Sequence, residues 1–197
     1  MPKRASGPTV PPTDVPASAE AGSSAAIDPR KVTFADRHLQ EEISNALEEL
    51  ADSLPELADL RLARSLSAIL EPSWSEHVDF QEAALFPIII RHKGGLEEAV
   101  SLLGRLSTEH TELADRHTEV SEYIEMLVAG ELTNYDTFGY LLRSAFEARR
   151  HHAVAESCIE DMLPRLLTPA DRTMLTEWRK ERSTPAFPIN LILDRRH

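Results

Sequence analysis

Four histidines lie in helix-like stretches of the sequence, on or beside faces that are otherwise apolar. They are His38, His77, His110 and His152, one in each of four long segments whose apolar residues are three and four apart. Glu156 follows His152 by four residues, and side chains at that spacing share one helix face. Imidazole and carboxylate together bind iron, manganese or zinc. The pattern predicts a metal site, because burying these groups unpaired would cost several kcal/mol.

The other histidines receive different roles. His117 also occupies a core position and is expected to support the site rather than to bind metal. His151 lies about 100° around the helix from His152, so we expect it to face a groove or solvent. His92 and His197 lie near segment ends, where solvated surface is expected. A single histidine on an apolar face would indicate only a hydrogen-bonded core residue; one in each of four segments favours ligands.

The segments that carry these histidines are predicted to be helices. The first covers residues 31–54 and the second begins at Pro55, with a break near Glu71 because Pro72 cannot continue a helix. The third and fourth cover Leu96 to Val128 and Tyr135 to Leu167. No segment alternates with period two, so no sheet is expected. Four amphipathic helices with short links predict an all-α, antiparallel up-down four-helix bundle.

Composition excludes several classes of function. The chain has 197 residues and a formal net charge of -12, which argues against binding to nucleic acid or to an anionic membrane surface. A single cysteine, Cys158, excludes an intrachain disulfide and favours a reducing compartment such as the cytoplasm. The sequence contains no apolar run of about 18 residues, so no membrane span is expected. The N-terminus lacks the apolar core of a secretory signal.

The sequence divides into three parts. Residues 1–29 are rich in Pro, Ser and Ala and are expected to form a disordered tail. Residues 30–183 form the predicted bundle. Residues 184–197, which include Phe187, Ile189 and Leu191, are interpreted either as a segment packed on the bundle or as a docking peptide for a protein partner.

Short motifs in all four segments resemble one protein family. "EHVDFQEAALFP" in the second segment is similar to the second helix of the hemerythrin-like, HHE cation-binding proteins. "ADRHLQEEI", "RLSTEHTELADRH" and "RRHHAVAESCIEDMLPRLLTPAD" resemble the first, third and fourth helices of that family in order. The resemblance covers about residues 31 to 180. It implies a hemerythrin-like bundle with a non-haem di-iron centre, whose ligands would be His38, His77, His110, His152 and Glu156.

Two departures from the family pattern concern the completeness of that centre. Gln81 stands where the family has a carboxylate, and a neutral amide cannot balance the charge of two cations. The adjacent Glu82 is the replacement ligand that we consider. It is turned about 100° away and reaches the site only if the helix is over- or underwound.

The second departure lies in the fourth segment, where Pro164 is further from His152 than in the family. A strict count would move the ligand positions to Val154 and Cys158, with Cys158 as a soft ligand or redox thiol. We prefer His152 and Glu156, with a local π-bulge absorbing the offset. Otherwise Cys158 is expected to be a small buried residue.

Two functions follow as expectations. The first is a hemerythrin-like protein with one or two iron ions that binds or senses a small ligand such as O2, NO or peroxide, or handles iron. Catalysis would then be limited to weak oxidase or peroxide chemistry, since no nucleophile triad, phosphate loop or nucleotide motif is present. The second is a metal-poor helical bundle that acts as a protein-interaction or regulatory module. Gln81 and the offset in the fourth segment favour this second function.

Overall fold

The computed structural model describes residues 29–92 and 97–182, with side chains from Thr33 onward. All of its regular structure is helical, and no strand occurs in these ranges, which confirms the predicted all-α class. The helices are α1 (Pro29–Ser53), α2 (Leu60–Asp79), the π-helix η1 (Phe80–Leu85), α3 (Phe86–His92), α4 (Glu97–Ala129), α5 (Tyr135–Glu160), α6 (Leu163–Leu166) and α7 (Pro169–Arg182). Of the predicted tail, 1–29, residues 1–28 lie outside the described residues and Pro29 begins α1; the segment 184–197 also lies outside them.

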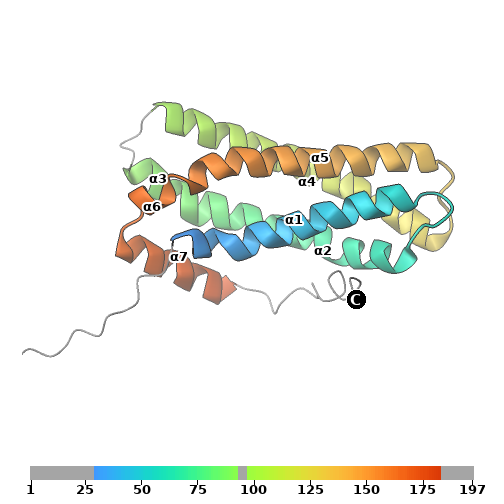
Figure 1. The fold of residues 1–197 in the computed structure, drawn as a ribbon, viewed down its shortest axis with the longest axis horizontal. Helices are drawn as coiled ribbons and strands as arrows, with labels where there is room; N and C mark the ends of the chain where they lie inside the picture. Colours follow the sequence, from blue (N-terminus) through green and yellow to red (C-terminus); the bar gives the residue numbers. More distant parts are fainter. Residues whose placement is uncertain (1–28, 93–96, 183–197) are drawn as a thin grey trace, which may run out of the picture.

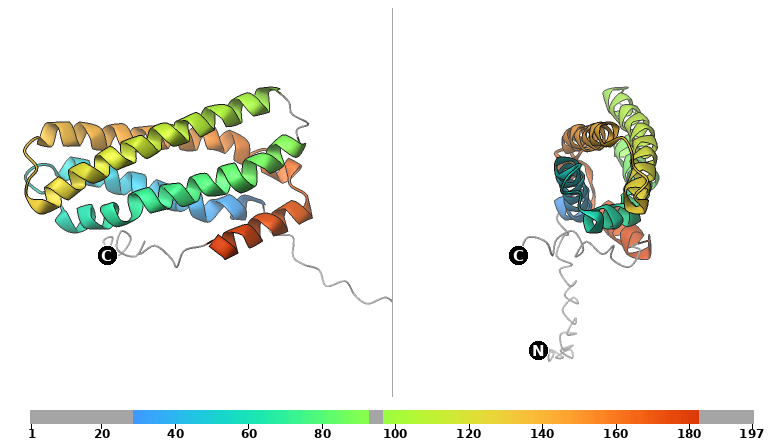
Figure 2. Two further views of the ribbon diagram at one scale, coloured as in Figure 1. Left: turned by 180° about the vertical axis from the view of Figure 1, so that it is seen from behind. Right: turned by 90° about the vertical axis from the view of Figure 1, so that its right-hand side faces the viewer.

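The long helices lie side by side around a common core (Figures 1 and 2). α1 packs against α2 and α5, and α4 packs against the same two helices. η1 and α3 extend the line of α2, while α7 lies across one end and contacts α1 and η1. None of the described helices is long and apolar enough to cross a membrane.

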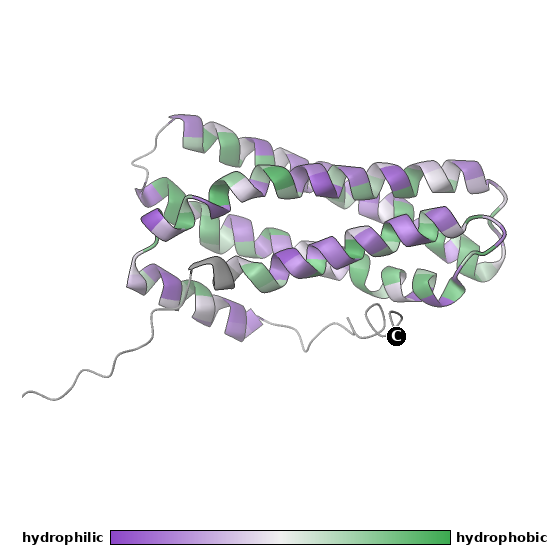
Figure 3. Ribbon diagram, viewed as in Figure 1, coloured by the Kyte–Doolittle hydropathy of each residue, from purple (hydrophilic) through white to green (hydrophobic). Residues whose placement is uncertain are grey.

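α4 shows why these segments fold as helices. Hydrophilic and hydrophobic residues are interspersed along the long helices (Figure 3), and the buried residues of α4 recur every three or four positions, which is the spacing that places them on one face. They are Leu103, Leu106, His110, Leu113, His117, Val120, Ile124 and Leu127. His110 and His117 are among these buried residues, as the sequence predicts.

The buried apolar residues form two clusters, one toward each end of the molecule. The first joins α1, α2, α4 and α5 and contains Leu66, Ile124 and Phe138. The second joins η1, α3, α4, α5, α6 and α7 and contains Phe80, Leu106 and Leu163. In α2, α4 and α5 the buried residues between the two clusters include histidines. A polar layer therefore lies between two hydrophobic cores.

The predicted break at Pro72 is wrong, because α2 continues through this proline. Pro72 is exposed, while Leu70 and Trp74 on either side are buried, so packing of the inner face holds the helix together where one backbone hydrogen bond is missing. The predicted start at Pro55 is also wrong. α2 begins at Leu60, where the Asp59 side chain accepts hydrogen bonds from the first backbone N–H groups.

The fourth predicted helix ends earlier than expected. α5 stops at Glu160 rather than Leu167, because Pro164 has no N–H to donate to the Glu160 carbonyl. The chain then forms the short α6 and a further helix, α7. Thr168 and Asp171 cap α7 reciprocally: the Thr168 N–H donates to the Asp171 carboxylate at 2.9 Å, and the Asp171 N–H donates to the Thr168 hydroxyl at 3.2 Å.

Candidate metal centre

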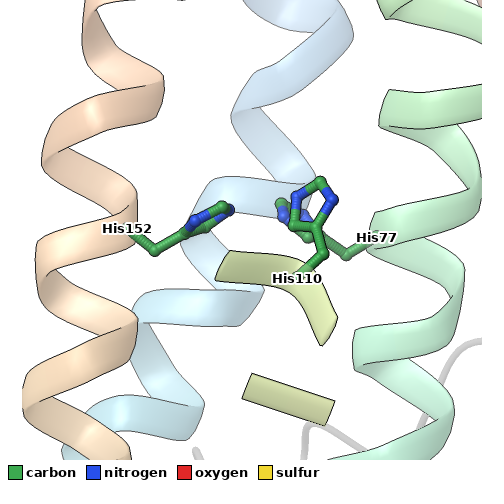
Figure 4. Close-up of side chains that lie close together, drawn as sticks. All are labelled: His77, His110 and His152. Atoms are coloured by element: carbon green, nitrogen blue, oxygen red, sulfur yellow. The ribbon is translucent and has the colours of Figure 1, made fainter. Parts of the chain in front are cut away.

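Three histidines from three helices meet in the polar layer. His77 of α2, His110 of α4 and His152 of α5 are each 2% exposed. One ring nitrogen of each lies within 4.8 Å of those of the other two, and Figure 4 shows the rings pointing toward one another. These are three of the predicted ligands, and the structure brings them together.

Each ring is held from outside by a carboxylate on its Nδ1 atom. The Nδ1 distances are 2.8 Å from His77 to Asp36, 2.7 Å from His110 to Glu82, and 2.9 Å from His152 to Glu109. A carboxylate that accepts the Nδ1 proton fixes the ring and raises the basicity of Nε2. Nε2 is therefore the nitrogen that each imidazole could offer to a metal ion.

The Nε2 atoms face a space that contains one carboxylate. Glu156 Oε1 is 3.1 Å from His77 Nε2 and 3.6 Å from His152 Nε2. The Nε2 atoms of His110 and His152 are buried and have no hydrogen-bond partner among the described residues. Three imidazole nitrogens and one carboxylate oxygen are a donor set that zinc and iron both accept. The unpartnered nitrogens fit a metal ion, which would satisfy their lone pairs.

The charge of the three rings differs. Burial opposes a charge on His77, but Asp36 and Glu156 outweigh it and raise the pKa of His77 to about 9. Burial lowers the pKa of His110 to about 4, and burial also lowers the pKa of His152. Near neutral pH the metal-free cluster is thus one imidazolium between two carboxylates, beside two neutral rings whose lone pairs are available.

Gln81 faces this cluster, as its position four residues after His77 predicts. Its Nε2 lies 3.3 Å from His77 Nε2 and donates to Glu156 Oε1. Its Oε1 is buried without a partner among the described residues. The structure contains a π-helix at this place, in η1, whereas α5 is α-helical throughout. The π-bulge considered for the fourth segment is therefore in the second.

Two predicted ligands do not join the cluster. His38 is exposed, stacks on Phe34 with ring centroids 6.5 Å apart, and lines a surface pocket. Asp36 reaches the site from α1 instead, and His38 lies about 200° around the helix from it. Glu82 is exposed and contacts the outer nitrogen of His110, so even in an underwound helix it supports a ligand rather than replacing Gln81.

A second polar group lies beside the histidines and contains a buried cation. Arg149 donates to His117 Nε2 at 2.9 Å, to Ser44 Oγ at 3.3 Å and to Gln40 Oε1. Burial lowers the pKa of Arg149 to about 9, so it remains charged at neutral pH. Trp74 lies between the two groups, with its ring centroid 4.8 Å from that of His77 and 5.2 Å from that of His117.

Sequence reasoning missed some of these residues. The sequence prediction gives Arg149 no role, although a charged residue among the apolar positions of a helix is a signal. Asp36 and Glu109 carried no signal, because their partners lie on other helices. His151 is exposed as expected, whereas Cys158 is exposed rather than buried. His92 is on the surface as expected, but it also contacts Asp171, 2.7 Å from its Nε2.

A groove of about 390 Å³ between α2 and α4 reaches the cluster from the surface. His110, Trp74 and Glu82 contribute to its walls, so a small molecule in the groove would meet the His110 side of the centre. Comparison with known proteins adds no assignment: no family profile, no curated protein and no solved structure matches the chain.

Proposed function

We propose that this chain is a metal-binding protein whose centre holds one ion of iron or of a chemically similar transition metal. The ligands are Nε2 of His77, His110 and His152 and the carboxylate of Glu156. The main support for the proposal is the two-sided arrangement of the three histidine rings. Each outer nitrogen contacts a carboxylate, and each inner nitrogen faces the same space. Carboxylate–histidine pairs of this kind are typical of protein metal sites.

The surroundings favour one ion over two. The facing donors are three imidazoles and one carboxylate, which is too little negative charge for two adjacent cations. Gln81 contributes a neutral amide at the place where a second carboxylate would help. The buried guanidinium of Arg149 adds a fixed positive charge next to the cluster, and this disfavours a second cation nearby.

The bundle is best interpreted as an up-down, hemerythrin-like four-helix bundle that binds or senses a small ligand. The four motifs occur in family order, and successive long helices reverse direction (Figure 2). Iron held by these four donors would supply binding of, or electron transfer to, O2, NO or peroxide, because coordination positions remain open. The chain's own residues would orient the ligands, and the groove between α2 and α4 would admit the small molecule. Cytoplasmic location is proposed from the single, free Cys158.

The test is the metal content of freshly purified full-length protein from iron-replete cells. We expect about one metal ion per chain, because the described residues offer one set of converging donors. His152→Ala should lose most of it, whereas His151→Ala, an exposed neighbour, should keep it. Well under one metal of any kind per chain in the wild type would contradict the proposal and favour the interaction-module function. Equal losses in the two variants would contradict the assignment of His152 as a ligand.

A further inference from the structure

α7 reaches the candidate metal centre through one side chain. Arg179 Nη2 lies 3.5 Å from Asp36 Oδ2. The same carboxylate oxygen is 2.8 Å from His77 Nδ1. A helix that packs across the end of the bundle is thus connected, through one carboxylate, to a ligand in the core.

Arg179 is fixed by its surroundings. Its guanidinium carbon lies 3.8 Å from the centroid of the Phe80 ring, and Phe80 in turn contacts Trp178, with ring centroids 5.7 Å apart. Its side chain is only 25% exposed. Phe80 is the first residue of η1, three positions after His77. The cation is therefore stacked against the turn that carries the ligand.

The other two carboxylate–histidine pairs lack such a connection among the described residues. Glu109 is paired with Arg105 of its own helix at 3.4 Å, and Glu82 contacts His110 at 2.7 Å. Both carboxylates are more exposed than Asp36, at 31% and 40% against 13%. Asp36 is therefore the carboxylate whose orientation another helix controls.

We propose that Arg179 is a positioning residue of the metal centre: by holding Asp36, it fixes the orientation of His77 and makes metal affinity depend on the docking of α7. This inference rests on the proposed metal site. Its physical basis is that a carboxylate on Nδ1 orients an imidazole ligand and raises its basicity. A carboxylate that rotates freely orients the imidazole less well. α7 then acts as a control element. Its displacement would release Asp36 and so loosen His77, although no residue of α7 is itself a ligand.

The experiment uses Co²⁺ as a spectroscopic probe of the full-length protein. Arg179→Met keeps most of the stem over Phe80 but removes the charge. It should raise the Co²⁺ Kd by roughly tenfold, the lower end of the range for residues that support ligands, and should change the visible spectrum of the bound ion. Arg179→Lys, which retains a cation, should restore most of the affinity.

Arg182→Met is the matched control. Arg182 lies on the same helix and over an aromatic ring, with its guanidinium carbon 4.6 Å from the Trp178 centroid, but no contact joins it to Asp36. It should leave both Kd and spectrum unchanged. In an Asp36→Asn background, Arg179→Met should add no further loss, because both changes act through the same carboxylate. The inference would be overturned if Arg179→Met kept the wild-type Co²⁺ affinity and spectrum. It would also be overturned if Arg179→Met lowered the affinity of the Asp36→Asn variant as much as it lowers that of the wild type.

A measurement without metal separates this inference from the proposed function. Solvent exchange of the His77 Nδ1–H proton, followed by NMR, should be faster in Arg179→Met than in the wild type or Arg182→Met. If the wild type takes up no Co²⁺, the metal centre is wrong, and this exchange rate alone decides the link from Arg179 to His77. If the wild type binds Co²⁺ and the exchange rates are equal, the link is wrong and the metal centre stands.

Discussion

At the scale of the residue, the centre depends on the two different nitrogens of each imidazole. In His77, His110 and His152 the Nδ1 atom is used for orientation, so that Nε2 is the nitrogen left to bind. The Nε2 atoms of His110 and His152 have no partner among the described residues, whereas that of His77 lies 3.1 Å from Glu156 Oε1. The three rings pack against Trp74. The site is therefore held ready before a ligand arrives, and two predictions follow from this balance of charges.

The first residue-scale prediction concerns the pH dependence of the metal-free protein. The pKa of His77 is raised to about 9, above its value of about 6.5 in the unfolded chain. Its contribution to stability is thus complete below pH 6.5 and is lost as pH rises through about 9. The free energy of unfolding should fall by about 1–2 kcal/mol between pH 7 and pH 8.5, measured by denaturant titration.

Asp36→Asn is the control for this pH dependence. It removes the carboxylate that contacts His77 Nδ1, so the fall between pH 7 and pH 8.5 should become smaller. His110 and His152, whose pKa values are lowered, are already neutral there in both states and do not contribute. An unfolding free energy that rises with pH over this range would contradict a charged His77.

The second residue-scale prediction concerns Gln81→Glu. The new carboxylate would stand beside Glu156, the group to which Gln81 now donates, so the metal-free variant should be less stable by about 1–3 kcal/mol. After identical iron loading the variant should hold more iron per chain than the wild type, because the added charge offsets repulsion between two cations. Elemental analysis side by side is the measurement. A wild type that already holds two irons would show that another group supplies that charge.

At the scale of the element, α7 makes polar contacts with the rest of the bundle near both of its ends. Near its start, Asp171 lies 2.5 Å from Arg91 Nη2 and 2.7 Å from His92 Nε2, besides capping its own helix through Thr168. Nearer its C-terminal end, Arg179 contacts Asp36. Since α7 has few buried residues of its own, namely Asp171 and Leu175, these polar contacts determine where it docks.

The element-scale prediction is that Asp171→Ala releases α7. The change removes the cap and both contacts to α3, and should lower the free energy of unfolding by about 1–3 kcal/mol. Hydrogen exchange of the α7 amides should increase much more than that of α4. Glu177→Ala, an exposed position on the same helix, is the control. Unchanged protection of α7 in Asp171→Ala would show that apolar packing alone holds it.

At the scale of the whole molecule, the polar layer separates two hydrophobic clusters that share α4 and α5. The layer contains buried charge from Arg149, His77 and Glu156, which contributes less to stability than apolar packing of the same volume would. A metal ion held by His77, His110, His152 and Glu156 would cross-link α2, α4 and α5 in this layer, between the two clusters.

The whole-molecule prediction is therefore a large thermal effect of metal. Free metal at about one hundred times Kd stabilises a protein by about 2.7 kcal/mol. For a chain of this size that raises Tm by roughly 5–11 °C. Differential scanning calorimetry with added Fe²⁺ or Co²⁺, then with a chelator, is the measurement. His152→Ala should show almost no shift; a shift as large as that of the wild type would place the ion elsewhere.

The sequence by itself determined the helical class, the burial of His110 and His117 in α4, and the three histidines that converge. These features follow from periodicity, since a residue's face on a helix is fixed by its own neighbours along the chain. His110 and His117 lie on the buried face of α4 because the apolar residues three and four positions away place them there. Pro164 also set the end of α5 by local chemistry, although the sequence prediction extended that helix to Leu167.

Only the tertiary structure decided how the histidines are held and which residue of α1 serves the site. His38 and Asp36 lie on the same short helical stretch, and neither periodicity nor residue type told them apart. The choice depends on how α1 rotates against α2 and α5, which many contacts along its length determine together. The carboxylates on Nδ1, the Arg149 network and the Arg179 contact all join side chains on different helices. Such pairs have no fixed spacing in the sequence, because distances between helices are set by packing rather than by the chain.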